Sequence, residues 1–295
     1  FGIHENGEIS KQLAETKSLF DSLLLTTENI SSQKNSASNL LENVVSDILG
    51  KLTTPFNIDL VQRKFPISYN NSMNTVLVQE MIRYNKLISV IHSSLVNVEK
   101  ALKGLIVMSS ELEDICKSIL MGKVPVQWAS KSYPSLKPLG SYVNDLLKRI
   151  LFLNAWFENG APLVYWLPGF FFTQSFITGA LQNYARKYTI PIDELSLDFE
   201  LVYNVTEPPT DGVYVNGLFL EGARWSKTKH CLAESYPKEL YDALPTILFK
   251  PIKSTELKPK SVYECPVYKT SERKGCRLIS RRNIGLMREL LLYYN

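Results

Sequence analysis

One periodic pattern constrains this protein more than any other feature of its sequence. Between residues 72 and 105, apolar or aromatic residues recur at alternating spacings of four and three. We refer to them as the heptad face, and they are Leu77, Met81, Tyr84, Ile88, Ile91, Leu95, Val98, Leu102 and Leu105. The pattern predicts a single helix, roughly 50 Å long, that presents a continuous apolar face to a partner.

The opposite side of this predicted helix is not uniformly polar, because Val76, Leu87 and Val107 lie on it. A helix with apolar residues on two sides is typical of the interior of a globular domain. We therefore expect the heptad face to pack within the chain, with a helix at about 109–120 as its main partner. A coiled-coil dimer through the same face is the alternative.

A second feature raises the question of a membrane. Residues 161–185 form a run of 25 positions without a charged side chain, which is long enough to cross a bilayer. Pro162, Pro168 and Gly169 interrupt its first third, and polar residues follow. We expect a helix from about Phe170 in the core of a globular domain rather than in lipid. Its two apolar stripes would be Phe170, Ile177, Leu181, Tyr184 and Tyr188, and Phe172, Phe176 and Ala180.

Composition excludes several classes of protein. The 295 residues are 45% hydrophobic and 21% charged, with a net charge of +4, which is typical of one large or two small globular domains. No dense Lys/Arg stripe is present, so nucleic acid is not an expected partner. The four cysteines, Cys116, Cys231, Cys265 and Cys276, lie far apart and are expected to be reduced thiols in a cytosolic compartment. Because the sequence begins at Phe1 rather than methionine, we expect it to be part of a longer protein.

The N-terminal segment predicts an amphipathic helix. Its apolar face has the same alternating spacing and consists of Ile9, Leu13, Thr16, Phe20 and Leu23. The segment 28–39 is rich in Ser and Asn, which predicts a flexible surface loop. A helix tethered by such a loop must bury its apolar face on this domain or on a neighbour.

The remaining patterns predict helices first and strands last. Further helices are expected at about 40–49 and 139–156, separated by a proline-containing irregular segment at 124–140. The expected strands are 195–203, 212–220, 223–226, 246–252 and 261–268. This order predicts an α+β fold with a helical N-terminal half and antiparallel strands in the C-terminal half.

Motifs that would indicate catalysis are missing from the sequence. Neither a P-loop nor a G-x-G-x-x-G fingerprint is present, and His4, His92 and His230 lie too far apart to predict a metal site. The carboxylates of 111–114 and the basic residues of 183–188 are explained by solvated helix surfaces. We expect no catalytic residue, cofactor or metal; a hydrolase that uses Cys116 or Cys231 as nucleophile is an open alternative.

Several stretches of the sequence are nevertheless familiar as a set. They are FGIHENGEISKQLAETKSLFDSLLL, NSMNTVLVQEMIRYNKLI, KGLIVMSSELEDI, SYPSLKPLGSYVNDLL, WLPGFFFTQSFITGALQNYARKYTIPIDELSLDFE, DGVYVNGLFLEGARW and CPVYKTSERKG. In this collinear order, over about residues 1–275, they resemble the C-terminal domain of dynein heavy chains, and the axonemal branch most closely.

The resemblance implies a non-catalytic module of an ATP-driven, minus-end-directed microtubule motor. Such a module packs on the AAA+ ring of its own heavy chain, and combines helices with an incomplete antiparallel β-barrel. Its further partners, the other dynein subunits and microtubules, would be reached through the parent complex; the location would be the cytoplasm and cytoskeleton, in a cilium or flagellum axoneme. The face formed by Ile9, Leu13, Phe20 and Leu23 would then dock on the ring. A free-standing adaptor that binds a protein through this face or the heptad face is the alternative.

Together, these considerations divide the protein into five parts. They are a docking helix (1–27), a flexible loop (28–39), a helical subdomain (40–195), an antiparallel β subdomain (196–280) and a tail (281–295). After KTSERKG, residues 276–295 read CRLISRRNIGLMRELLLYYN and depart from the family pattern. We expect a barrel that ends in this way to lack its closing strand and to expose an unpaired edge.

Overall fold

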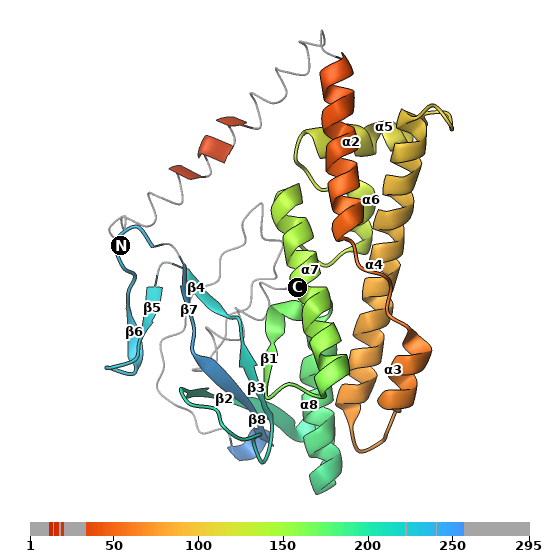
Figure 1. Cartoon of the computed structure of the whole chain (residues 1–295). Coiled ribbons are helices and arrows are strands. Elements are labelled where there is room, and N and C mark those ends of the chain that lie inside the picture. The colour runs from red at the N-terminus through yellow and green to blue at the C-terminus, as the bar shows by residue number, and fades with distance from the viewer. Residues whose placement is uncertain are drawn as a thin grey trace.

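The computed structural model describes residues 34–256, apart from 222 and 240, together with residues 12, 13, 15–17, 19 and 20. The α-helices are α2 (Lys34–Lys51), α3 (Ile58–Lys64), α4 (Ser72–Leu102), α5 (Ser110–Leu120), α6 (Val126–Lys131), α7 (Leu139–Asn159) and α8 (Thr173–Tyr188). The strands are β1 (Val164–Trp166), β2 (Leu195–Val202), β3 (Val213–Asn216), β4 (Phe219–Glu221), β5 (Ala223–Ser226), β6 (Cys231–Glu234), β7 (Tyr241–Ala243) and β8 (Thr246–Lys253). Short 3-10 helices are η1 (Leu167–Gly169), η2 (Ile192–Glu194) and η3 (Ser254–Glu256). Figure 1 shows these elements in place.

Helix α4 is the central element of the helical layer, as its periodicity predicts. It runs for 31 residues, and the side chain of Asn71 caps it by accepting a hydrogen bond from the backbone N–H of Met73 at 3.1 Å. The heptad face is buried from Leu77 to Val98, and α4 as a whole contacts α2, α3, α5, α6, α7 and α8. The expectation of α5 as the main partner is therefore too narrow, because several helices share this long face.

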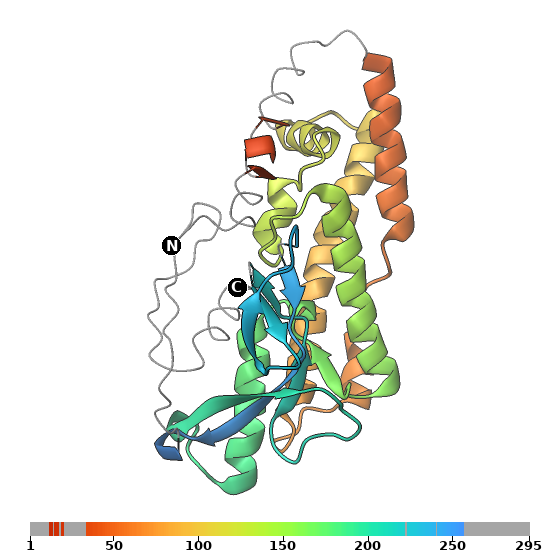
Figure 2. The same cartoon turned by 90° about the vertical axis from the view of Figure 1, so that its left-hand side faces the viewer.

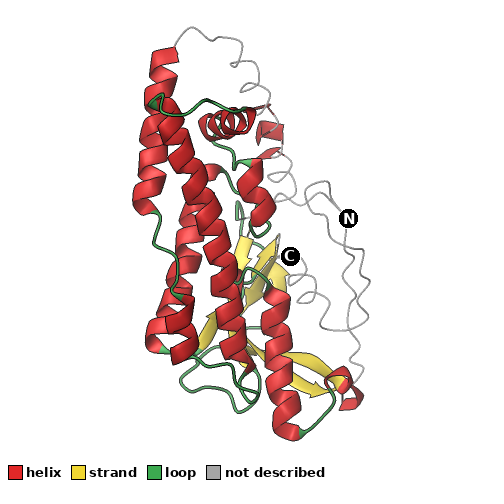
Figure 3. Cartoon of the chain, turned by 90° about the vertical axis from the view of Figure 1, so that its right-hand side faces the viewer, coloured by secondary structure: helices red, strands yellow, loops and turns green. Residues whose placement is uncertain are grey.

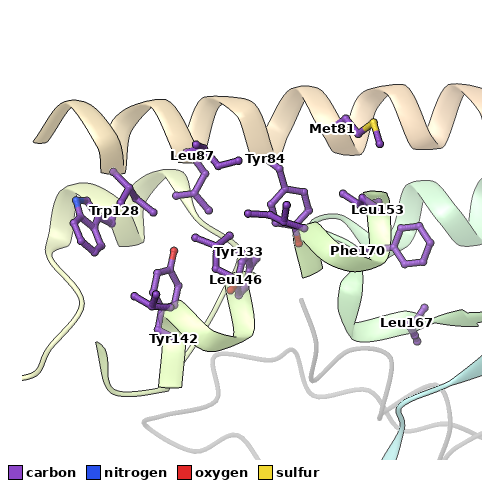
Figure 4. Packing of buried hydrophobic residues seen from close by; sticks show 14 of the residues in the cluster. Met81, Tyr84, Leu87, Trp128, Tyr133, Tyr142, Leu146, Leu153, Leu167 and Phe170 are labelled. Atoms are coloured by element: carbon purple, nitrogen blue, oxygen red, sulfur yellow. The ribbon is translucent and has the colours of Figure 1, made fainter. Parts of the chain in front are cut away.

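This burial also removes two of the alternatives. A face that is covered by helices of its own protein is not free to form a coiled-coil dimer or to bind an external protein. Figure 4 shows part of the packing, in which Tyr84 and Leu87 of α4 face Tyr133 and Leu146. Only Leu105, beyond the end of α4, departs from the pattern and is exposed.

Two stretches expected to be irregular are helical. Helix α2 begins at Lys34 rather than near Leu40, so the second half of the expected loop 28–39 forms its first turns. Helix α6 occupies six residues within the segment 124–140, directly after Pro125. Both cases have a physical reason: Ser and Asn cost little in the first turn of a helix, and proline is well suited to the start of one.

The uncharged run 161–185 is divided among β1, η1 and α8. None of the helices within the described residues is both long enough and apolar enough to cross a membrane. In α8, Phe176 and Ala180 are buried, whereas Phe172 and Tyr188, which we expected on the apolar stripes, are largely exposed. The core thus uses a narrower part of this helix than its composition indicates.

The C-terminal half contains one four-stranded sheet in the order β1-β3-β8-β2 and two two-stranded ribbons, β4-β7 and β5-β6. Most pairs are antiparallel as expected, but β1 pairs with β3 in parallel. The sequence pattern did not reveal β1, β6 and β7, each of which is only three or four residues long. The described residues form no closed barrel, and the strand expected at 261–268 lies outside them.

Helices and strands share one core. The main cluster of buried side chains includes Val213, Val215, Ile247 and Phe249 from the sheet together with residues from the helices α2 to α8. Helix α8 contacts both α4 and the strands β2 and β8. Figures 2 and 3 show the strands gathered along one side of the helical layer.

Candidate functional site

The expected docking helix is helical wherever the structure describes it, at positions within residues 12–20. Leu13 and Phe20 lie seven residues apart, on one face, and are 57% and 60% exposed. Ile9 and Leu23, the other two residues expected to dock, lie outside the described residues. Leu13 and Phe20, the two expected docking residues that the structure describes, are therefore accessible to a partner.

The structure places the candidate metal ligands and the two candidate nucleophiles, Cys116 and Cys231, in different surroundings, and Cys231 is exposed. Within the described residues, no group of three or more His, Cys, Asp or Glu side chains is placed to hold a metal ion. His92 and His230 are both exposed, and Nδ1 of His230 lies 3.1 Å from the hydroxyl of Tyr203. Cys116 is buried, and burial raises the pKa of its thiol, so the reactive thiolate is disfavoured.

Charged residues that we expected on solvated surfaces are found there, except Arg186, which is partly buried against Ser72 and Tyr69. Glu111, Glu113 and Asp114 are exposed at the start of α5. Negative charges near a helix N-terminus interact favourably with the helix dipole. Lys187, near the end of α8, forms an ion pair with Asp211 at 2.7 Å. These groups stabilise helix ends and do not form a catalytic arrangement.

Glu80 of α4 has a structural role that the sequence analysis did not predict. Its side chain is fully buried, and its carboxylate accepts hydrogen bonds from the backbone N–H groups of Phe171 and Phe172. It also pairs with Arg83 at 2.7 Å. Burial raises the pKa of Glu80 in spite of these contacts. The carboxylate thus fixes the backbone just before α8 begins.

A second buried charge holds the same segment from α7. Arg149 forms an ion pair with Asp145 at 2.7 Å, and its guanidinium donates to the carbonyl oxygen of Phe170 at 3.3 Å. Its guanidinium carbon lies 3.7 Å from the ring centroid of Tyr133. In addition, the hydroxyl of Tyr84 donates to the carbonyl of Gly169 at 3.0 Å. The backbone of residues 169–172 is therefore held by side chains from both α4 and α7.

The sequence does contain a signal for these buried charges. Glu80 lies three residues after Leu77 and four before Tyr84, and Arg149 lies three after Leu146 and four before Leu153. Charged residues at such positions fall within the apolar face of a helix. A charge in that position is costly unless it is paired and hydrogen-bonded, so it indicates a specific partner.

A groove of about 680 Å³ lies between the N-terminal half of α4 and α8. Its walls carry mainly hydroxyl and amide side chains, with Tyr69 and Phe172 as the aromatic ones. Arg186, also on the wall, donates to the hydroxyl of Ser72 at 2.8 Å and lies over the ring of Tyr69. These groups can hydrogen-bond a polar ligand, but the described lining supplies no general acid or base.

The loop between α4 and α5 is apolar, in contrast to the groove, whose walls are mainly polar. Four consecutive apolar residues, Leu105 to Met108, are exposed at its surface. They lie at the end of the helical layer where α4, α5 and the start of α2 meet (Figure 1). Contiguous exposed apolar residues of this kind mark interaction surfaces.

Comparison with known proteins agrees with the resemblance stated above. The family model for the C-terminal domain of dynein heavy chains matches residues 13–284, which extends beyond residue 275, where we expected the resemblance to end. This protein is 54% identical to dynein axonemal heavy chain 12 of Rattus norvegicus. It is 51% identical to dynein axonemal heavy chain 3 of Mus musculus and 46% identical to dynein axonemal heavy chain 1 of Homo sapiens.

Each of these alignments covers 93% of the 295-residue sequence. They cover 9% of the rat protein and 7% of each of the other two, so the sequence spans less than a tenth of the length of these relatives. The family match includes Leu13 and Phe20, and the helix-then-strand order of the described fold lies within it. The protein therefore belongs to the family of C-terminal domains of dynein heavy chains.

Proposed function

We propose that this segment is a non-catalytic structural and regulatory domain of an axonemal dynein heavy chain. It packs on the AAA+ ring of the same polypeptide, an ATP-driven motor that moves toward the minus ends of microtubules. Its place of action would be the axoneme of a cilium or flagellum, with other dynein subunits as partners through the parent complex. Family membership and the axonemal names of its relatives support this proposal.

The observation that carries the docking part is the exposed face of the N-terminal helix. Leu13 and Phe20 are large apolar side chains, each more than half exposed. Burying such a side chain in an interface is favourable by about 1.5–3 kcal/mol. We propose that Ile9 and Leu23 extend this face, and that all four side chains are buried against the ring.

The finer organisation of the domain follows the same proposal. We infer that the predicted strand at 261–268 joins the described strands in an incomplete antiparallel β-barrel. We also propose that the domain is divided into five parts after residues 27, 39, 195 and 280, although α2 begins within the segment 28–39. No cofactor is needed, because the domain acts by packing.

The test uses a heavy chain of the axonemal type that lacks this segment. It is mixed with the purified 295-residue protein, and co-elution and ATP turnover are followed together. Phe20→Asp should weaken co-elution at least tenfold and leave the melting temperature of the 295-residue protein nearly unchanged, because Phe20 is exposed. Gln12→Asp places the same charge at an exposed polar position of the same helix and should co-elute like the unmodified protein.

Two results would contradict this proposal. Co-elution of Phe20→Asp at the unmodified level would show that this face does not dock. If the folded, unmodified protein does not co-elute and leaves ATP turnover unchanged, packing on the ring is refuted. The adaptor function, which would use the same helix for a separate protein, would then take first place.

A further inference from the structure

We propose that the α4–α5 loop, formed by Leu105, Ile106, Val107 and Met108, is a second docking element. It inserts its apolar side chains into another part of the same dynein heavy chain. This inference rests on the proposed function, and it adds an anchor at a different place in the fold, far along the sequence from the N-terminal helix.

The first observation is the exposure of the loop. Leu105 is 70% exposed and Val107 is 90% exposed, and Ile106 and Met108 are also exposed. A run of four exposed apolar residues is unfavourable in water, so it is expected only where a partner covers it. The loop therefore has the composition of an interface rather than of a solvated turn.

The second observation is that both ends of the loop are held in a defined geometry. The backbone N–H of Leu105 donates to the carbonyl of Lys100 at 2.9 Å, and that of Gly104 donates to Ala101 at 3.0 Å. Gly104 has a φ of 70°, and together these features make a Schellman motif at the end of α4.

At the other end, the side chain of Ser109 accepts a hydrogen bond from the backbone of the third residue of α5 at 3.3 Å. A Schellman motif is often accompanied by an apolar contact of the residue after the glycine. Here that residue is Leu105, which is instead exposed. A loop fixed at both ends loses little conformational entropy on docking, so its apolar side chains are well placed to bind.

The size of the loop identifies the kind of partner. A stable interface between separate proteins takes about 20–30 residues on each side, and four side chains are far fewer. A covalently connected partner is present at an effective concentration on the order of millimolar, so a small anchor is sufficient. Since the match covers only 9% of the rat relative, a heavy chain of this kind offers a large connected partner. We therefore assign the loop to an apolar pocket elsewhere in the same heavy chain.

The experiment measures how fast a cysteine at the loop reacts with a maleimide. Val107→Cys is introduced into the 295-residue protein and into a heavy chain that includes the segment, and its labelling is followed on the peptide by mass spectrometry. Cleavage after Glu111 or Glu113 places residue 107 and the native Cys116 on different peptides, so their labelling is measured separately. We expect labelling at least tenfold slower in the heavy chain, once both are normalised to the denatured state.

Two matched sites complete the experiment. Val126→Cys, at an 80% exposed valine that begins α6, should react at nearly the same rate in both proteins. Equal slowing at residue 126 would show that protection is general, and would overturn the proposal. Phe20→Cys reports separately on the proposed function, because it lies on the N-terminal helix.

The remaining outcomes are distinguishable. Protection at residue 20 but not at 107 would overturn this inference and leave the proposed function in place, whereas no protection at either site would overturn both. Protection at 107 that rises with the concentration of the 295-residue protein alone would assign the loop to a second copy. Protection that requires added dynein subunits would assign it to a separate protein. Either of these last two results would refute the assignment to the same heavy chain.

Discussion

Replacement of Glu80 by glutamine tests whether the buried carboxylate holds the start of α8. One carboxylate oxygen accepts from the backbone of Phe171. The other accepts from the backbone of Phe172 at 3.2 Å and pairs with Arg83 at 2.7 Å. A glutamine of nearly the same shape has one carbonyl oxygen and one NH₂ group. It must therefore leave one of the two backbone N–H groups facing another donor.

The magnitude follows from these contacts. A buried donor without an acceptor costs about 1–3 kcal/mol. The weakened contact to Arg83 costs less than about 1 kcal/mol, because that guanidinium is partly solvated. Relief of the desolvation that raises the pKa of Glu80 offsets part of this cost. We expect Glu80→Gln to lower the free energy of unfolding by about 2 kcal/mol, or the melting temperature by about 4–8 °C.

Urea unfolding followed by circular dichroism at neutral pH measures this difference. Glu99→Gln is the control, because Glu99 is also on α4 but forms an exposed ion pair with Lys103, and it should change the free energy of unfolding by less than about 0.5 kcal/mol. If the two variants were equally stable, the buried carboxylate would not hold the segment before α8, and this reasoning would be refuted.

Two further predictions concern other parts of the fold. Burial acts to raise the pKa of Asp145, but hydrogen bonds and charge from Lys137 and Arg149 lower it overall. The stability that Asp145 contributes is therefore present above its unfolded pKa and is lost as pH falls through its folded pKa. Asp145→Asn should make the free energy of unfolding depend less steeply on pH in this acidic range. An unchanged pH dependence would contradict the assignment. Gly212→Ala should destabilise the protein by about 2 kcal/mol or more, because its φ is 89° and a Cβ there would lie 2.1 Å from a backbone oxygen of β8. Gly50→Ala, which meets nothing within 4 Å in α2, should instead stabilise by up to about 1 kcal/mol in a thermal melt; a loss of stability there, or none at Gly212, would refute this comparison.

Elements with many local repeats could be predicted from the sequence. Helix α4 follows from its heptad spacing, and α5, α7 and α8 follow from shorter patterns of the same kind, because each turn of a helix repeats the same local relation between side chains. The strands β2 and β8 were also expected, since each is eight residues long and rich in apolar residues. These predictions needed no knowledge of what each element packs against.

Elements that depend on distant partners could not be predicted in the same way. Strand β1 has three residues, and its parallel partner β3 begins about fifty positions later, so no local pattern distinguishes it from the uncharged run around it. The six residues of α6 are too few for a periodic signal. Pairing and packing, rather than propensity, decide such short elements.

The two candidate docking surfaces also differ in whether the sequence predicted them. The apolar spacing of the N-terminal helix indicated a docking face, and its described docking residues, Leu13 and Phe20, are exposed. Val107, by contrast, was expected on the second apolar side of α4, but it lies on an exposed loop because α4 ends at Leu102 and Gly104 turns the backbone. Residues 105–108 form an exposed loop because the backbone turns at Gly104, and the sequence pattern did not predict the position of that turn.

By itself, the sequence determined the family, the helix-then-strand order and the amphipathic faces, because these depend on residue identity and on spacing between residues. The tertiary structure alone decided which faces are covered. It buried the heptad face within the protein, paired β1 with β3, and brought Glu80 and Arg149 onto one segment before α8. The physical reason is that burial is a property of what lies opposite a side chain, and residues far away in the sequence supply that neighbour.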